Sequence, residues 1–209
     1  MSSVRTRKFT RRELAGLMIA GIAAATASCP VSARAALTPA EDYVSRIADD
    51  VMRLANSGQQ GNRLRDRFAN LLNRYINLRN IANFALGPYR SKLPNSKKDE
   101  FYELVGNYTA ALFVYYIEDF RGSDLEILSN IKQGKFITIH SAIKLRGGGR
   151  EQVRWRLVQS SSGGFNVTDV NIKGVWLTIS MKKRFGDVLN KSRGDFEALF
   201  TELREAETW

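Results

Sequence analysis

The chain has 209 residues and a net charge of +11, with 32 basic and 21 acidic side chains but only one histidine and one cysteine. A single cysteine excludes an intramolecular disulfide, and one histidine with one cysteine cannot supply the usual ligand set of a zinc site. The basic excess would suit nucleic acid, but nearly half of it lies in the N-terminal segment described next.

The first 35 residues have the organisation of an export signal. A basic stretch precedes a nearly uncharged run over residues 14–28, and Ala33-Arg34-Ala35 has the small–x–small pattern of a signal-peptidase site. The uncharged run is shorter than the roughly 20 residues that a membrane-spanning helix needs. We therefore expect cleavage after Ala35, export to the periplasm and one domain over residues 36–209.

The pair Arg11-Arg12, followed by Glu13-Leu14, favours the twin-arginine export route over the general secretory route. Removal of residues 1–35 takes away the only cysteine, Cys29. It also lowers the net charge from +11 to +6, because that segment holds six basic residues and one acidic residue. A positive excess of this size fits either an anionic lipid surface or an ordinary solvated surface, and nucleic acid is not an expected partner in the periplasm.

The first half of the domain has helical periodicity. Thr38-Pro39-Ala40-Glu41 combines an N-cap residue, proline at the first helical position and an early acid, so a helix is expected to begin there. Apolar residues at helical spacing predict four helices, over residues 39–56, 62–75, 78–86 and 97–120. The last of these carries a broad apolar stripe that must bury against other elements: Phe101, Leu104, Val105, Tyr108, Leu112, Tyr115 and Tyr116.

The pattern then changes to a period of two, in which hydrophobic side chains alternate with polar ones. One apolar and one polar face indicate an antiparallel sheet covered on one side. The predicted strands cover residues 124–130, 135–146, 151–160, 165–172 and 175–179, with a bend at Lys173-Gly174. Two more helices are expected over residues 182–190 and 193–207. Helices, then a strongly twisted antiparallel sheet of four to five strands, then helices define an α+β fold.

Little in the domain indicates catalysis or metal binding. His140 is the only histidine and alternates onto the face of its strand opposite the isoleucines. The adjacent carboxylate pairs Asp49-Asp50, Asp99-Glu100 and Glu118-Asp119 point apart on a helix and do not form acid–base partners. Gly147-Gly148-Gly149 lies between two strands and is interpreted as a turn, because a phosphate-binding loop precedes a helix. We therefore expect no catalytic residue, metal or cofactor.

Several segments carry a family resemblance through their order and spacing. They are Phe68-x-x-Leu71-Leu72-x-x-Tyr75-Ile76, Ile81-Ala82-x-Phe84-Ala85-Leu86-Gly87-x-Tyr89-Arg90, the aromatic stripe, and Phe165-x-Val167-x-Asp169-Val170-x-Ile172-x-Gly174-Val175-x-Leu177. Together they resemble the MlaC, or toluene-tolerance, family of periplasmic phospholipid-binding proteins. Asn77, Lys173 and Trp176 depart from the residues usual in that family, so a hopanoid-associated or other divergent member is an alternative.

The resemblance implies a carrier and not an enzyme. Members of the family shuttle phospholipid between an outer-membrane complex of lipoprotein and porin and an inner-membrane ABC transporter with its substrate-receiving subunit. Each methylene moved out of water is worth about 0.8 kcal/mol, so two acyl chains with about 30 methylenes need on the order of 24 kcal/mol of shelter. An apolar cavity between sheet and helices is therefore expected.

Residues that combine an apolar side chain with a suitable predicted position are candidates for the lipid-binding site. They are Phe84, Leu86, Tyr89, Phe101, Val105, Tyr108, Leu112, Tyr115, Trp155, Val175 and Leu177. Two alternatives remain open. A cone-shaped α+β enzyme would place His140 or a buried carboxylate in the cavity, and an interaction protein would have a filled core without lipid.

Overall fold

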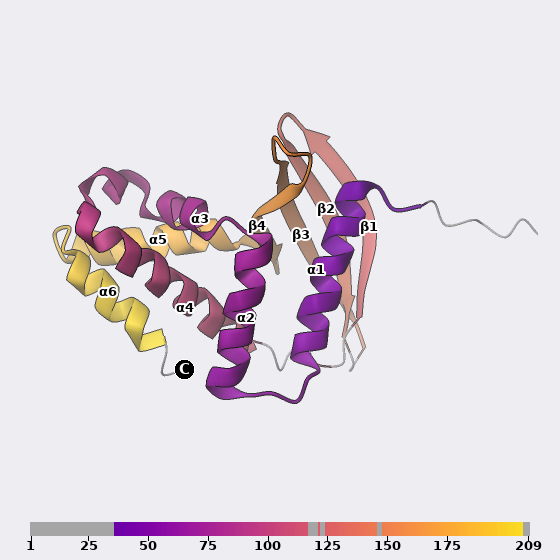
Figure 1. Cartoon of the computed structure of the whole chain (residues 1–209), viewed down its shortest axis with the longest axis horizontal. Coiled ribbons are helices and arrows are strands. Elements are labelled where there is room, and N and C mark those ends of the chain that lie inside the picture. The colour runs from indigo at the N-terminus through magenta and orange to yellow at the C-terminus, as the bar shows by residue number, and fades with distance from the viewer. Residues whose placement is uncertain (1–35, 117–120, 122–123, 146–147, 207–209) are drawn as a thin grey trace, which may run out of the picture. The chain divides into compact units, whose positions relative to one another are not determined.

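The structure is a computed structural model, and it describes residues 36–116, 121, 124–145 and 148–206. Its elements confirm the predicted α+β order of helices, antiparallel sheet and helices (Figure 1). The helices before the sheet are α1 (Pro39–Ala55), α2 (Gly61–Tyr75), α3 (Leu78–Leu86), the short 3-10 helices η1 (Gly87–Lys92) and η2 (Asn95–Lys97), and α4 (Lys98–Tyr116). The predicted export signal and residues 117–120 of the predicted fourth helix lie outside the described residues.

Five strands and two further helices complete the described chain. The strands are β1 (Asp124–Gln133), β2 (Phe136–Lys144), β3 (Arg150–Gln159), β4 (Phe165–Ile172) and β5 (Val175–Trp176), and the helices are α5 (Leu177–Lys191) and α6 (Phe196–Glu205). None of the described helices is long and apolar enough to cross a membrane.

Local sequence signals account for the helix starts. Thr38 forms a capping box with Glu41: its backbone N–H donates to Glu41 Oε2 over 2.8 Å, and its Oγ1 accepts from the Glu41 N–H over 3.4 Å. The Asn77 side chain caps α3 by accepting from the Asn80 N–H over 3.1 Å. Between α2 and α3, the extended residue Ile76 forms a single parallel bridge with Val167 of β4. The Thr38 cap thus marks the start of α1, and the extended Ile76 with the Asn77 cap separates α2 from α3.

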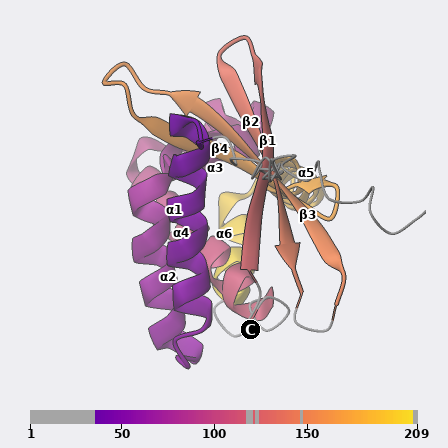
Figure 2. The ribbon, with the colours of Figure 1, turned by 90° about the vertical axis from the view of Figure 1, so that its right-hand side faces the viewer.

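The sheet is antiparallel throughout, in the order β1-β2-β3-β4-β5. The alternation puts Ile139, Trp155 and Leu157 on one face, here called the inner face, and His140 and Arg154 on the opposite outer face. Register shifts interrupt the β1–β2 and β3–β4 ladders, and such bulges increase local twist. The strands accordingly fan apart in Figure 2.

The prediction of a strand over residues 175–179 is wrong beyond its first two positions. β5 ends at Trp176, and Leu177 already belongs to α5. The cause is the buried carboxylate of Asp169 in β4, which accepts from the Thr178 N–H over 3.0 Å and from the Thr178 hydroxyl over 2.7 Å. A contact between residues nine positions apart therefore overrides the strand propensity of this β-branched segment.

The final helix also starts later than predicted. The prediction put its beginning at residue 193, but a turn over residues 192–195 precedes α6. Gly194 has a φ of +89°, and its N–H donates to the Leu189 carbonyl over 2.7 Å. Asp195 then caps α6 by accepting from the Glu197 N–H over 2.9 Å. A glycine-based helix end followed by an N-cap explains the shift.

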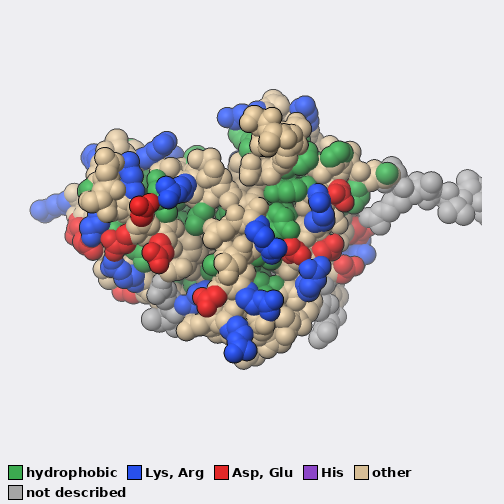
Figure 3. Space-filling view, in the orientation of Figure 1, with side chains coloured by type: hydrophobic (Ala, Val, Ile, Leu, Met, Phe, Trp, Pro, Cys, Tyr) green, Lys and Arg blue, Asp and Glu red, His purple; other side chains and the backbone are tan. Residues whose placement is uncertain are grey.

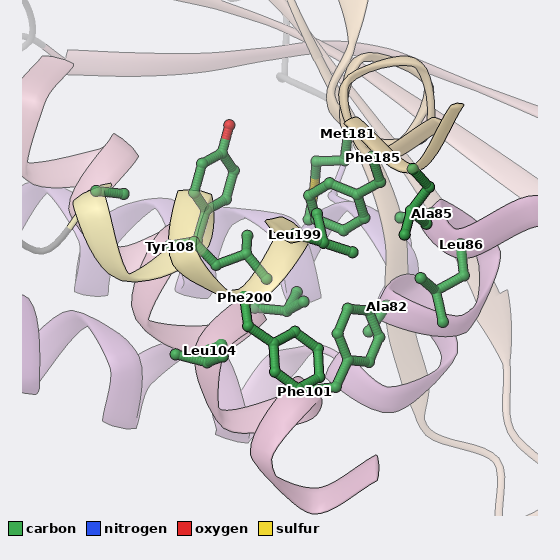
Figure 4. Close-up of a cluster of buried hydrophobic side chains, with 14 of the residues drawn as sticks. Ala82, Ala85, Leu86, Phe101, Leu104, Tyr108, Met181, Phe185, Leu199 and Phe200 are labelled. Atoms are coloured by element: carbon green, nitrogen blue, oxygen red, sulfur yellow. The ribbon is translucent and has the colours of Figure 1, made fainter. Parts of the chain in front are cut away.

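Buried hydrophobic residues form three clusters. The helical cluster joins α3, α4, α5 and α6 and includes Phe101, Phe185 and Phe200, each at most 1% exposed (Figure 4). A second cluster joins α1, α2 and α4. The third lies between α1 and the inner face of the sheet, and includes Ile139 and Leu157. Helices α1 and α2 thus form a layer beside the inner face, as both ribbon views show.

Candidate functional site

Six of the predicted lipid-binding residues lie together in the helical cluster. They come from α3, η1 and α4, and are Leu86, Tyr89, Phe101, Val105, Tyr108 and Leu112. Phe101 lies with its ring centroid 6.2 Å from both Phe185 of α5 and Phe200 of α6. The Tyr108 ring is likewise 6.2 Å from Phe185 (Figure 4). Ring contacts at these distances describe a packed helical core at this end of α4.

The degree of exposure changes along α4. Phe101 and Val105 are fully buried, Tyr108 is 8% exposed, and Tyr115 near the end of the helix is 64% exposed. Tyr108, Leu112 and Tyr115 are spaced by four and three residues, so they share one face of the helix. Their side chains form a row, here called the α4 row, that leads from the core to the surface.

Helix α5 has a matching row. Phe185 and Met181 belong to the helical cluster, and Leu177, one turn before Met181, is 40% exposed. We call Leu177, Met181 and Phe185 the α5 row. It also leads from core to surface, but toward the N-terminal end of its helix, where α5 leaves β5.

The two rows diverge toward the sheet. Figure 1 shows the end of α4 and the beginning of α5 on the side of the helices that faces the strands, and the two helices spread apart there. Figure 2 shows α5 behind the strands at about mid-height and the end of α4 lower down. The exposed apolar ends of both rows thus lie toward the sheet, where the two helices are farthest apart.

The other predicted residues lie outside the helical cluster. Trp155 belongs to the third cluster, between α1 and the inner face of the sheet, and its indole N–H donates to Ser141 Oγ over 3.0 Å. Val175 is 51% exposed at the edge strand. Phe84 is 46% exposed on α3, with the ammonium of Lys182 5.2 Å from its ring. The structure therefore groups six candidates in the helical cluster. The other five lie at the exposed ends of the two rows, on the sheet or on the surface of α3.

Two contacts hold the α1–α2 layer in place beside this region. The Asn130 amide in β1 donates to Glu41 Oε1 over 2.9 Å, and this bond, with the Thr38 backbone N–H, holds the pKa of Glu41 below its usual value. The Tyr75 hydroxyl donates to Asp50 Oδ2 over 2.7 Å. That bond lowers the pKa of Asp50 and raises the pKa of Tyr75. Both contacts tie α1 to its neighbours through charge-assisted hydrogen bonds.

A pocket that the sequence did not predict lies where α2, α3 and α4 meet. It has a volume of about 640 Å³, and its lining mixes apolar residues with charged and amide groups, including Arg79, Asp99 and Asn107. Arg79 donates to Asp99 over 3.2 Å, and its guanidinium lies 4.8 Å from the Tyr102 ring. A pocket with such a lining suits a polar ligand better than acyl chains.

A sequence signal for this pocket exists in hindsight at Gly106. A β-carbon there would lie 3.0 Å from Leu78 Cδ2, so a glycine inside α4 lets α3 approach closely. The face of the molecule that includes α1 and α2 mixes both signs of charge with hydrophobic side chains (Figure 3). The charged side chains that line the pocket are two arginines and two carboxylates, so it does not concentrate charge of one sign.

The candidate catalytic groups do not face the apolar rows. His140 is half-buried on the outer face of the sheet. Asp169 is 4% exposed on the same face, and its carboxylate accepts from the Val170 N–H over 2.9 Å in addition to both Thr178 donors. This carboxylate anchors α5 to β4. Among the described residues, no three His, Cys, Asp or Glu side chains are grouped so that they could hold a metal ion.

The family model described as MlaC protein matches residues 45–205. Among solved structures, the chain is similar to a phospholipid-binding protein from Ralstonia solanacearum, determined in complex with a phospholipid. The two share 18% sequence identity with a TM-score of 0.69, over 82% of this chain and 98% of that one. No curated protein matches the sequence significantly.

Proposed function

Because the chain belongs to the MlaC family, we propose that it carries phospholipid across the periplasm, with the acyl chains held between α4, α5 and the inner face of the sheet. The observation that carries this proposal is the pair of apolar rows. Each leads from the packed helical cluster to an exposed apolar residue, Tyr115 on α4 and Leu177 on α5. Exposed apolar side chains continuous with a core are expected where an apolar ligand enters.

The energetics of lipid transfer support this position. Each methylene removed from water contributes about 0.8 kcal/mol, so only an enclosed apolar site can hold two acyl chains firmly. The helical cluster from which both rows start and the cluster between α1 and the inner face, which includes Trp155, are both apolar. We propose that α4 and α5 separate at their diverging ends to admit the acyl chains. Met181 and Leu112, the middle residues of the two rows, are then the first that the chains meet below the surface.

The polar groups are placed as a carrier requires. Three carboxylates, those of Glu41, Asp50 and Asp169, accept hydrogen bonds that tie helices to one another or to the sheet, and none of the three belongs to either row. A carrier that leaves the head group outside needs no catalytic cluster and gains little head-group selectivity. We therefore propose binding without chemistry, and the phospholipid bound to the similar Ralstonia protein supports this assignment.

We further propose that the carrier exchanges its cargo with membrane complexes at both ends of its path. In this proposal, an outer-membrane lipoprotein–porin complex stands at one end and an inner-membrane ABC transporter with its receiving subunit at the other, as the family's function implies. The basic, then apolar N-terminal segment supports export of the domain to the compartment between them.

Native mass spectrometry of residues 36–209, purified without detergent, tests the proposal. We expect a population heavier than the bare chain by the mass of one phospholipid, and organic extraction should identify it. A hopanoid or another lipid in its place would retain the carrier function and change the cargo. A bare mass together with an empty lipid extract would contradict lipid binding.

A further inference from the structure

The outer face of the sheet carries a ladder of aromatic and arginine side chains that lipid carriage does not use. We call Phe136, Arg154, Arg156 and Trp176 the outer-face ladder. The Arg156 guanidinium lies 3.9 Å from the centroid of the Trp176 ring and 5.7 Å from that of Phe136. Arg154 lies 5.8 Å from the Trp176 ring. The alternation along β3 puts both arginines on its polar face, and with these ring contacts they are half-buried.

The ladder holds more positive than negative charge. In the described part of the chain Arg156 is paired with Asp169, with 3.8 Å between Arg156 Nη1 and Asp169 Oδ2, too far for a hydrogen bond. Its oxygens are occupied by Thr178 and the Val170 N–H instead. Arg154 donates to the neutral Asn171 side chain over 3.1 Å. Arg156 therefore has a carboxylate nearby that already accepts other hydrogen bonds, and Arg154 is bonded to a neutral amide.

The surroundings of the ladder add basic and apolar groups. The Lys135 ammonium lies 5.3 Å from the Phe136 ring at the tip of the β1–β2 hairpin. Ile131, whose cross-strand partner Thr138 is also the partner of Arg156, is 55% exposed, and Phe136 is 36% exposed. Lys173 stands in the turn that leads to Trp176. The opposite face, seen in Figure 3, mixes both signs of charge instead.

We propose that the outer-face ladder docks the protein on an anionic phospholipid bilayer. Tryptophan and other amphipathic rings favour the head-group level of a membrane, and guanidinium groups pair with lipid phosphate. Because Trp176 and Phe136 hold the two arginines on the outer face, little side-chain freedom is lost when phosphate binds. Docking rests on the proposed carrier function for its purpose: it concentrates the carrier at the membrane surface, where lipid is exchanged.

Vesicle co-sedimentation tests docking independently of cargo. The mature chain is mixed with vesicles of phosphatidylcholine alone or with added phosphatidylglycerol, and binding is measured as salt is raised. We expect binding only to the anionic vesicles, and a decrease with salt because exposed charges are screened. Arg154→Gln with Arg156→Gln should weaken binding by about 30-fold, the effect of two basic residues at an anionic surface. Arg154→Lys with Arg156→Lys keeps the charge and should bind far more tightly than the glutamine pair.

A matched control removes the same charge elsewhere. Arg63→Gln with Arg67→Gln changes two exposed arginines of α2 and should leave vesicle binding within about twofold. Native mass spectrometry of each variant reports cargo separately, so a failure of docking and a failure of the carrier function are distinguished. Absence of binding by the unmodified chain, or equal losses in the α2 pair and the ladder pair, would overturn the proposal. Binding of a soluble acidic protein instead of the vesicles would do the same.

Discussion

Replacement of Leu177 by glutamate is a sharp test of the apolar rows. Leu177 is 40% exposed, and the buried part of its side chain contributes about 1 to 2 kcal/mol to folding, so the variant should remain folded. With the proposed geometry, however, the new carboxylate would face the acyl chains. A charge in a hydrocarbon environment costs about 3 kcal/mol on insertion scales, which corresponds to a roughly 100-fold loss of lipid affinity.

Ile179 provides the matched control two positions further along α5. It is 52% exposed, and successive helical residues are about 100° apart, so its side chain points away from the α5 row. The two variants, Leu177→Glu and Ile179→Glu, are purified without detergent and compared by native mass spectrometry and thermal unfolding. We expect lipid loss in the first only, with both remaining folded. Full occupancy of Leu177→Glu, or the same loss in Ile179→Glu, would refute the assignment of the row.

Three further substitutions test the framework that positions the rows. Tyr75→Phe removes the hydroxyl that lowers the pKa of Asp50, and should cost about 1 kcal/mol of folding free energy at neutral pH. A lowered carboxyl pKa stabilises the fold only while the carboxyl group is ionised. Denaturant titrations should therefore show the difference between variant and parent shrink as pH falls through the acidic range where Asp50 is protonated. Asp169→Ala leaves the Thr178 and Val170 donors without their acceptor and should lower the free energy of unfolding by about 3 kcal/mol or more, whereas a change near zero in urea titration would show that α5 is anchored otherwise. Gly174→Ala, at φ +81° with open space around the added carbon, should cost about 1 kcal/mol from backbone strain alone, measured as a melting temperature a few degrees lower.

The sequence predicted the parts of the fold that short-range signals determine. The capping residues around Thr38 placed the start of α1, and alternation along β2 and β3 placed Ile139 and Trp155 on one face and His140 on the other. The strand predicted at 175–179 failed because Asp169, on another strand, holds the first turn of α5. When a side chain on a neighbouring strand determines where a helix starts, the sequence around the helix start does not show it.

The candidate site was less accessible to sequence reasoning. Phe101 and Tyr115 belong to the same apolar stripe, and periodicity assigns them the same face, yet one is fully buried and the other is 64% exposed. What separates them is where α5 and α6 cover α4, which is a tertiary property. Likewise, alternation puts Arg156 on the polar face of β3, but gives no sign that Trp176 stacks against it.

Photo-crosslinking with a phospholipid that carries a reactive group at the end of an acyl chain tests the central claim most directly. The lipid is loaded into a protein of residues 36–209 and cross-linked, and the labelled residues are mapped by peptide mass spectrometry. The account predicts labels on the α4 and α5 rows, at Leu112, Met181 or their neighbours, and on the inner face near Trp155. Labels confined to the pocket between α2 and α4, or to the outer face of the sheet, would contradict it.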